Sequence, residues 1–463
     1  MESIQIRLVN GEETNSEPSQ VFQIPEDTTP VQLNALVNKL NKTEEEPYPY
    51  SFYTEDAQII EKVPNKGSEE VVIVTYYPQA IFRCRPISHS THTMTGHSNS
   101  ILSCKFSQDS TKLVTSSGDH TVRLWDLNSC TPITTLKEHG DWVLNVDWHY
   151  SGRYVASGDK LGKVIIWEVN EDGTDAKKVS SYCHTNFISD IQWKPQVYGD
   201  DCIFASASRD FSTKIYDVKR QEVVRTLGGH TQGVTCVRWS GRENILYTSS
   251  RDRTINIYDV RQYNPINVLR GHSHWINSLS LSTDYVLRQG GYDPLEKDKG
   301  IDGARKRLNK VISSGGGERL VSASDDGTLY MWMPTASQKP LHRLVGHSSQ
   351  VMSCKFSPDS RYIASMGCDK SIKLWDGFKG TCLHTYRGHV QTVYACAWSP
   401  DSRMFVSASK DSTVKLWSAL PNSRKLLSNL PGHLDEVFAV DWSNDGSTVA
   451  TASYDHTIKI WRC

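Results

Sequence analysis

Short segments in which apolar and polar residues alternate recur along most of the chain. Two examples are residues 234–239 (VTCVRW) and residues 254–258 (TINIY). A period of two is typical of β-strands that bury one face, and the short polar runs between the segments are typical of turns. From residue 88 onward the pattern therefore predicts an all-β structure built from many short strands.

The predicted strands form a repeat whose units share fixed marks. Each of eight units opens with a dipeptide ending in histidine and closes with an aromatic residue, and six units place these marks 28 residues apart. Seven units also carry an aspartate six residues before the aromatic. The histidines are His97, His139, His184, His230, His272, His347, His389 and His433; the aspartates are Asp119, Asp210, Asp252, Asp326, Asp369, Asp411 and Asp455; the aromatics are Trp125, Trp167, Tyr216, Tyr258, Trp332, Trp375, Trp417 and Trp461.

A repeat of about 40–45 residues with these marks is typical of WD repeats, each of which forms a four-stranded blade of a β-propeller. We therefore predict an eight-bladed propeller. The histidine, the aspartate, a Ser or Thr and the tryptophan of one unit can form a buried hydrogen-bonded chain, so we assign them a structural role rather than a catalytic or metal-binding one. Leu161 replaces the aspartate in the second unit, where we expect an incomplete network.

The two ends of the repeat region predict how the ring closes. The third strand of the last unit ends near Trp461, so the outermost strand of that blade has to come from residues before the first unit. Residues 88–95 are available, and their pairing would remove a free sheet edge. We therefore divide the chain into an N-terminal domain (1–80), a connector that supplies the closing strand (81–95) and the propeller (96–463).

The fifth unit contains an insertion at about residues 284–317 that carries Arg305, Lys306, Arg307 and Lys310. It follows the first strand of its blade, so we expect it to project from the face opposite the histidine-bearing loops. Long insertions in compact domains are usually functional or disordered. Two interpretations stay open here, a solvated loop and a basic docking or targeting element.

The N-terminal domain has a different pattern. Residues 3–9, 20–24, 51–53 and 71–76 are predicted strands, and a helix is predicted to begin at Thr28-Thr29-Pro30, with hydroxyls at the cap and proline in the first turn. The order β-β-α-β-β suggests a small α+β, ubiquitin-like fold. The domain continues directly into the propeller without a Gly-Gly end, so we interpret it as a fixed docking module.

Composition narrows the classes of function. The chain has 51 basic and 52 acidic residues, so no global field attracts it to nucleic acid or to a membrane. We expect no secretory leader, no membrane contact and a monomer. No C-x-x-C pair is present, and Cys104, Cys354 and Cys396 occupy a position that is aliphatic in other units, which predicts small buried hydrophobes. Residues 315–317 (GGG) lack the Lys-Ser/Thr of a phosphate loop, so we expect neither an enzyme nor a small-molecule substrate.

The loops that carry the histidines predict a partner-binding patch. An aromatic residue follows the histidine by three positions in three units, and a basic residue precedes the turn aspartate in three units. Aromatic and arginine anchors suit a protein hot spot, or stacking and phosphate contacts with RNA. The residues are Trp142, Phe187, Trp275, Arg209, Arg251 and Lys410.

Several stretches resemble the Notchless family of large-ribosomal-subunit assembly factors. They include residues 29–34 (TPVQLN), 47–53 (PYPYSFY), 281–288 (LSTDYVLR) and 430–438 (LPGHLDEVF), and the resemblance covers nearly the whole chain. It implies a nucleolar and nucleoplasmic protein without a cofactor of its own, whose propeller binds the pre-60S particle.

The same resemblance implies that the N-terminal domain binds midasin, a large AAA ATPase, through the adhesion-site domain that holds a Mg²⁺ ion. The family's acidic ligand to that ion aligns with Glu69, with Glu70 beside it. An exposed carboxylate is the ligand type that a hard divalent cation prefers. The alternatives are a solvated Glu69-Glu70 turn, and a scaffold or substrate adaptor in ubiquitin ligation or Notch-type signalling.

Overall fold

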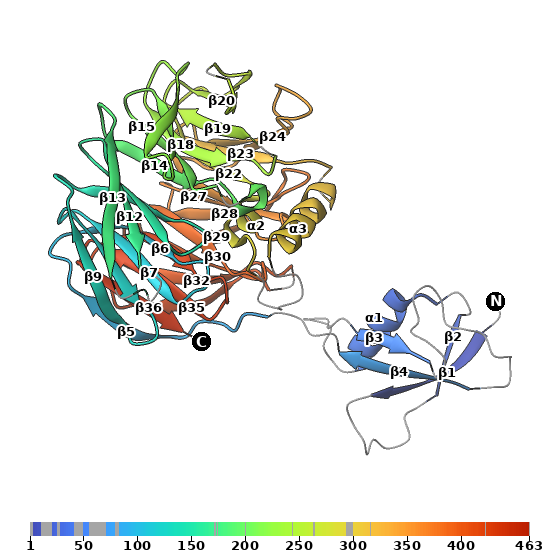
Figure 1. The fold of residues 1–463 in the computed structure, drawn as a ribbon. Coiled ribbons are helices and arrows are strands. Elements are labelled where there is room, and N and C mark those ends of the chain that lie inside the picture. The colour runs from blue at the N-terminus through green and yellow to red at the C-terminus, as the bar shows by residue number, and fades with distance from the viewer. Residues whose placement is uncertain are drawn as a thin grey trace. The chain divides into compact units, whose positions relative to one another are not determined.

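The computed structural model describes residues 3–10, 21–25, 28–40, 50–54, 71–78 and 83–462, the last range with short gaps at 171–172, 174, 200, 243, 263, 293–299, 315 and 422. The chain divides into two compact units, Met1–Phe82 and Arg83–Cys463. They are described separately (Figure 1).

The first unit is one mixed sheet with a helix. Its elements are β1 (Ser3–Asn10), β2 (Val21–Pro25), α1 (Pro30–Leu40), β3 (Tyr50–Tyr53) and β4 (Val72–Pro78), in the sheet order β2-β1-β4-β3. The two central strands are parallel and the outer pairs are antiparallel. Helix α1 begins at the predicted proline, where the Gln32 side chain accepts the Thr29 N–H at 2.9 Å as in a capping box. Leu33 and Val37 of the helix are buried against the sheet.

The second unit contains eight four-stranded antiparallel sheets, numbered 1 to 8 here by their innermost strands β6, β10, β14, β18, β22, β26, β30 and β34. Sheets 1 to 4 consist of β6 (Ile101–Phe106), β7 (Lys112–Ser117), β8 (Thr121–Asp126), β9 (Thr131–Lys137), β10 (Val143–Trp148), β11 (Tyr154–Asp159), β12 (Lys163–Val169), β13 (Ala176–Cys183), β14 (Ile188–Trp193), β15 (Ile203–Ser208), β16 (Thr213–Asp217), β17 (Glu222–Leu227), β18 (Val234–Trp239), β19 (Ile245–Ser250), β20 (Thr254–Asp259) and β21 (Asn267–Arg270).

Sheets 5 to 8 consist of β22 (Ile276–Leu281), β23 (Leu320–Ser324), β24 (Thr328–Trp332), β25 (His342–Val345), β26 (Val351–Phe356), β27 (Tyr362–Gly367), β28 (Ser371–Asp376), β29 (Cys382–Arg387), β30 (Val393–Trp398), β31 (Met404–Ser409), β32 (Val414–Ser418), β33 (Leu426–Leu430), β34 (Val437–Trp442), β35 (Thr448–Ser453), β36 (Thr457–Arg462) and β5 (His89–Thr95). Three helices lie outside the sheets: η1 (Gln196–Tyr198), α2 (Asp284–Gln289) and α3 (Gly300–Ser314).

The sheets form a closed ring. Each innermost strand contacts the innermost strand of the next sheet, and β34 contacts β6. The outermost strand of sheet 8 is β5, which precedes the first repeat in the chain and pairs with β36 in the register Thr95↔Thr457 to His89↔Arg462. The last sheet thus combines the two ends of the unit and leaves no unpaired outer edge on β36.

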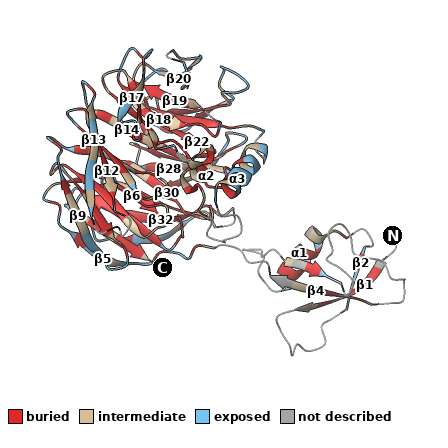
Figure 2. Ribbon diagram, viewed as in Figure 1, coloured by how far each residue is buried: buried red, intermediate tan, exposed pale blue. Residues whose placement is uncertain are grey.

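The core lies between successive sheets (Figure 2). In one such cluster Val114 and Leu124 of sheet 1 pack against Val146 and Trp148 of sheet 2. Cys104, Cys354 and Cys396 are buried and free, which confirms the predicted hydrophobic role of these positions. In the described part of the chain, no helix is long and apolar enough to cross a membrane.

Candidate functional site

The marked residues of five repeats, in sheets 1 and 5 to 8, form one buried hydrogen-bonded chain that includes the tryptophan. In sheet 1 the Trp125 indole donates to Thr115 Oγ1 at 2.9 Å, Thr115 Oγ1 lies 2.9 Å from His97 Nε2, and His97 Nδ1 lies 2.8 Å from Asp119 Oδ2. The threonine hydroxyl accepts from the indole and donates to Nε2, so His97 carries its proton on Nδ1 and donates it to Asp119.

All eight sheets contain this histidine-to-carboxylate link, with distances of 2.8 to 3.0 Å. A Ser or Thr oxygen lies 2.7 to 2.9 Å from the other ring nitrogen. In sheets 3 and 4 the closing aromatic is a tyrosine, which bonds elsewhere: Tyr216 donates to Ser180 and Tyr258 to the Gly228 carbonyl.

Sheet 2 corrects one expectation from the sequence. Its network is complete although Leu161 occupies the aspartate position, because Asp159, two residues earlier, bonds His139 Nδ1 at 2.9 Å. Asp159 also accepts the Lys163 N–H, whose equivalent binds the aspartate in sheet 1, and the Leu161 N–H, whose equivalent there binds Ser117. The repeat pattern does not reveal Asp159, because the pattern compares residues at one fixed position, whereas a carboxylate two residues earlier can still reach the histidine.

The environment of these groups supports a structural role rather than a catalytic or metal-binding one. Burial lowers the pKa of His97 despite its bond to Asp119, so the imidazole is neutral. Burial alone would raise the pKa of Asp119, but hydrogen bonds from His97 and Thr121 hold it well below its usual value. Within the described residues, no group of three or more His, Cys, Asp or Glu side chains could hold a metal ion.

The histidine-bearing loops bring together most of the predicted partner-binding residues. The Arg251 guanidinium lies 4.4 Å from the ring centre of Trp275, and the Arg209 guanidinium lies 5.3 Å from that of Phe187. Gly233 occupies the equivalent aromatic position in sheet 4, and a Cβ there would approach Arg209 Cγ to 2.8 Å. Sheets 3 to 5 therefore present a row of two stacked arginine–aromatic pairs, which we call the Arg–aromatic row (Phe187, Arg209, Arg251, Trp275).

The other two predicted residues of this patch are in sheets 2 and 7, and neither pairs with a residue of the row. Trp142 in sheet 2 is 38% exposed, and its neighbour is Lys160, whose ammonium is 5.1 Å from the ring centre. Lys410 in sheet 7 forms an ion pair with Glu436 at 3.0 Å, and Tyr394 donates to the same carboxylate. Because its charge is neutralised by a side chain of sheet 8, Lys410 does not extend the Arg–aromatic row.

The described residues of the insertion in sheet 5 form two helices and not a solvated loop. Helix α2 lies over one end of the ring, where Arg288 donates twice to Asp441 of sheet 8 at 2.7 Å and Gln289 accepts from Gln108 of sheet 1. Helix α3 packs behind it through Ala304 and Leu308. The insertion therefore bridges sheets that are distant in sequence (Figure 1).

The basic residues of the insertion divide between two roles. Arg307 donates to the carbonyls of Gly290 and Tyr292, and Arg305 donates to the Val197 carbonyl, so both fasten α3 to its neighbours. Lys306 and Lys310 are exposed, and Figure 2 shows exposed residues along α3.

A buried carboxylate that sequence reasoning missed holds the end of the insertion. Glu318 accepts hydrogen bonds from the Ser240 hydroxyl, the Gly241 N–H and the Tyr247 hydroxyl of sheet 4, and from the Thr283 hydroxyl. In the sequence, the three glycines before Glu318 suggested only a possible phosphate loop, and Glu318 itself carried no signal. Four donors to one buried carboxylate instead make Glu318 an anchor.

Glu69 and Glu70, the predicted ligands of a partner's metal ion, lie outside the described residues.

Comparison with protein-family models identifies both units. The model "WD domain, G-beta repeat" matches residues 88–126, 130–168, 221–259, 299–333, 338–376, 380–418 and 424–462. These seven matches leave out residues 169–220, where the structure nevertheless has the first three strands of sheet 3 and its His184–Asp210 link. The model "NLE (NUC135) domain" matches residues 4–63 of the first unit.

The chain is similar to a designed protein in fold and to natural proteins in sequence. The crystal structure of the computationally designed Ika8 protein matches with a TM-score of 0.63 and 22% identity, over 81% of this chain and 100% of that one, which shows the fold alone. Ribosome assembly protein 4 of Saccharomyces cerevisiae is 36% identical over 80% of this chain and 77% of its own length. The Notchless protein homolog of Arabidopsis thaliana is 42% identical (77% of each chain), and Protein Notchless of Drosophila melanogaster is 40% identical (77% and 75%). The chain therefore belongs to the Notchless and Ribosome assembly protein 4 family of WD-repeat proteins.

Proposed function

We propose that this protein is a non-catalytic factor in assembly of the large ribosomal subunit, acting in the nucleolus and nucleoplasm. In this proposal the eight sheets are the blades of one propeller that binds the pre-60S particle, and the first unit is a ubiquitin-like domain that docks to midasin. The observation that carries the proposal is the similarity to Ribosome assembly protein 4, which extends over 80% of the chain.

The proposed division of labour is supported by how the second unit begins. The Cys84 N–H donates to Asp401 of sheet 7 at 2.8 Å, and β5 then pairs along the whole of β36. A pull applied to the first unit would therefore reach two adjacent sheets of the ring within a few residues. Such a connection suits a protein that transmits an ATPase's force to a bound particle.

We propose that Glu69 supplies a carboxylate ligand to the Mg²⁺ ion held by midasin, so this protein needs no cofactor of its own. The experiment measures binding of the purified full chain to the adhesion-site domain of midasin with Mg²⁺ and with a chelator. Binding should require Mg²⁺, and Glu69→Ala should abolish it, because the ion then lacks its last anionic ligand. Glu44→Ala, another carboxylate of the same unit, serves as the matched control, and equal binding by Glu69→Ala and the control would refute the role of Glu69.

The Arg–aromatic row is the proposed contact of the propeller with the pre-60S particle. Trp275 is 38% exposed and the other three residues are partly exposed, and aromatic and arginine anchors dominate many interfaces. The double variant Arg251→Ala/Trp275→Ala should reduce co-sedimentation of the tagged chain with pre-60S particles at least several-fold. Leu341→Ala, a truncation at a 45% exposed residue of the same unit, should not. Unchanged co-sedimentation of the double variant, or recovery of ubiquitin-ligase subunits without pre-ribosomal RNA, would contradict the proposal.

A further inference from the structure

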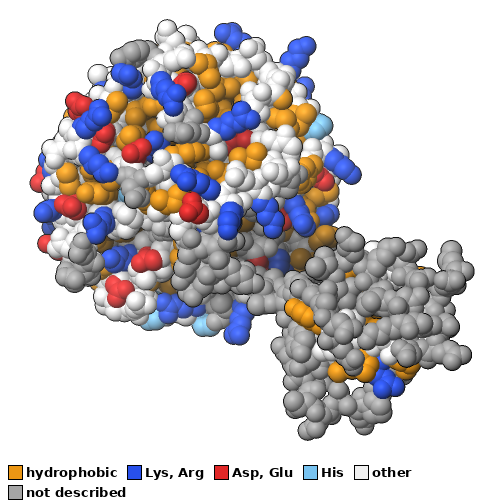
Figure 3. All heavy atoms as spheres, turned by 45° about the vertical axis from the view of Figure 1, so that its right-hand side comes forward, with side chains coloured by type: hydrophobic (Ala, Val, Ile, Leu, Met, Phe, Trp, Pro, Cys, Tyr) orange, Lys and Arg blue, Asp and Glu red, His pale blue; other side chains and the backbone are white. Residues whose placement is uncertain are grey.

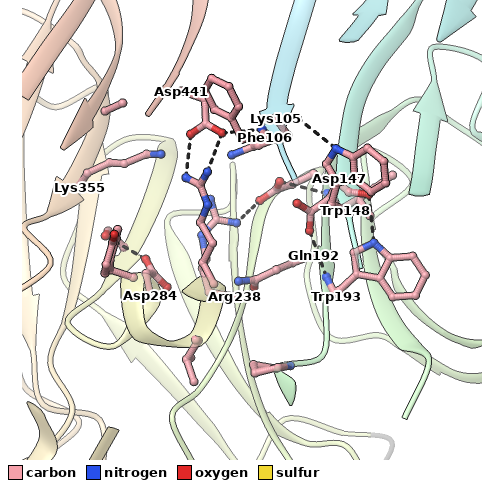
Figure 4. A pocket seen from close by; sticks show the side chains of 18 of the residues that line it. Lys105, Phe106, Asp147, Trp148, Gln192, Trp193, Arg238, Asp284, Lys355 and Asp441 are labelled. Carbon is pink, nitrogen blue, oxygen red and sulfur yellow. Dashed lines mark hydrogen bonds and ion pairs between the residues drawn. The ribbon is translucent and has the colours of Figure 1, made fainter. Parts of the chain in front are cut away.

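The ring encloses a cavity of about 270 Å³ beneath helix α2. Its wall consists of side chains from the innermost strands of all of sheets 1 to 8, and α2 contributes Asp284, Leu287 and Arg288 (Figure 4). At one level of the ring, successive sheets place Lys105, Asp147, Gln192, Arg238, Ser280, Lys355, Ala397 and Asp441 on this wall.

Two of these wall residues come from the same short sequence. Residues 103–107 and 353–357 both read SCKFS, in sheets 1 and 6. Because alternate residues of a strand point to opposite faces, the cysteine and phenylalanine enter the core while the serine and lysine line the cavity. Serine and lysine donors therefore converge on the cavity from two directions.

The acidic side chains of the cavity are already engaged. Asp441 accepts two hydrogen bonds from Arg288 and one from the Phe106 N–H. Asp190 pairs with Arg238 at 2.5 Å, and Asp284 accepts from Ser280 and from the Leu281 N–H. Asp147 accepts the Trp193 N–H, and burial raises its pKa to about 6.

The two lysines are not engaged in this way. In the described part of the chain, no hydrogen bond or ion pair engages the Lys105 or Lys355 ammonium group, although Asp441 attracts both charges and Asp147 attracts that of Lys105. Burial lowers the pKa of Lys355 to about 8, with the charge of Lys105 adding to the effect. Both lysines are only partly exposed, and neither ammonium group has a hydrogen-bonded partner to offset its lost hydration, so an anion that contacts both would be stabilised between them.

We propose that this cavity binds a small phosphate-type oxyanion between Lys105 and Lys355, with the Ser103 and Ser353 hydroxyls as further donors. Phosphate or a small phosphate monoester offers several charged oxygens, enough to accept from both sheets at once. The bound anion would join sheet 1 to sheet 6 across the ring, under the helix that covers this end.

The test titrates inorganic phosphate into the full chain at pH 7 in a calorimeter, against chloride at matched ionic strength. We expect one saturable site. Lys105→Met and Lys355→Met should each weaken phosphate binding about tenfold, the effect of losing one charge-assisted hydrogen bond, whereas the exposed Lys379→Met should not change it. No saturable binding, or equal affinity in all three variants, would overturn the site.

A second measurement does not depend on the variants folding. Crystals of the unmodified chain soaked in tungstate should show an anomalous peak in the cavity within contact distance of both ammonium groups. A cavity that holds only water under these conditions, or peaks confined to the outer surface, would refute the proposal.

Discussion

At the residue scale the stability of the protein depends on buried polar side chains that form hydrogen bonds with one another within each sheet. Asp159 shows this most clearly. It is fully buried and provides the acceptor for His139 and for two turn N–H groups, although it stands at a position where the other sheets have serine or glycine. The carboxylate can shift along the chain because from either position it reaches the histidine Nδ1 and the N–H that begins the next strand.

Asp159→Ala should therefore lower the free energy of unfolding by about 2–4 kcal/mol, since it leaves a buried imidazole N–H and two backbone N–H groups without an acceptor. The measurement is urea-induced unfolding. Leu161→Asp serves as the control, and it should bring no comparable gain because the network is already complete. A large stabilisation by Leu161→Asp would show instead that sheet 2 lacks a needed carboxylate.

The neutral histidines predict how stability depends on pH. Burial lowers the pKa of His97, His139 and His184 in the folded protein, so below about pH 6.5 the unfolded chain binds protons that the folded protein does not. Their contribution is complete above that pH and is lost on acidification, by up to about 1.4 kcal/mol per histidine and pH unit. The depressed pKa of Asp119 adds a further loss below about pH 4.

Urea midpoints at pH 8, 7, 6 and 5 test this pH dependence, and we expect them to fall from pH 7 to pH 5. Midpoints that rise over that interval would mean that the histidines are charged and form ion pairs with the aspartates.

At the element scale two features complete the ring. The β5–β36 pairing joins the two ends of the second unit, and helix α2 covers one end of the ring. The first could be predicted from sequence because a four-stranded sheet whose third strand ends the repeat needs a fourth strand from elsewhere, and β5 does pair with β36. The position of α2 could not be predicted from the sequence, because Arg288 and its partner Asp441 are 153 residues apart and nothing in the local pattern links them. The same holds for Glu318, whose donors come mainly from the preceding sheet.

Arg288→Ala should destabilise the second unit by about 2–4 kcal/mol, because Asp441 is 1% exposed and would lose two charged donors. The charge-removing control Arg305→Ala affects a side chain that is 54% exposed and should cost less than about 1 kcal/mol. Urea-induced unfolding of both variants measures the two losses in the free energy of unfolding. Equal small losses would show that α2 is not held through Arg288.

A chain that begins at residue 83 should fold as a monomer, whereas one that begins at residue 97 should aggregate. The shorter chain lacks β5 and so exposes the edge of β36 to pairing with other molecules. Size-exclusion chromatography with light scattering compares the two. A monomeric, cooperatively unfolding chain from residue 97 would show that the closing strand is dispensable.

At the scale of the whole molecule, the proposed function gives separate tasks to the two units. Basic and acidic side chains are interspersed over the visible face of the second unit (Figure 3), so specific binding has to rest on local features such as the Arg–aromatic row. The order of elements in the first unit was predictable from hydrophobic spacing. The role proposed for Glu69 could be inferred only from the family resemblance, because a pair of glutamates in a polar stretch has no distinguishing local pattern.

The most direct test of this account is affinity purification of the full chain and of its Glu69→Ala variant from cells, with pre-60S components and midasin quantified in both. The account predicts that the variant retains pre-60S particles at the wild-type level, accumulates on them and loses midasin. Equal recovery of midasin by both proteins, or loss of the particles together with midasin, would contradict the separation of anchoring and docking between the two units.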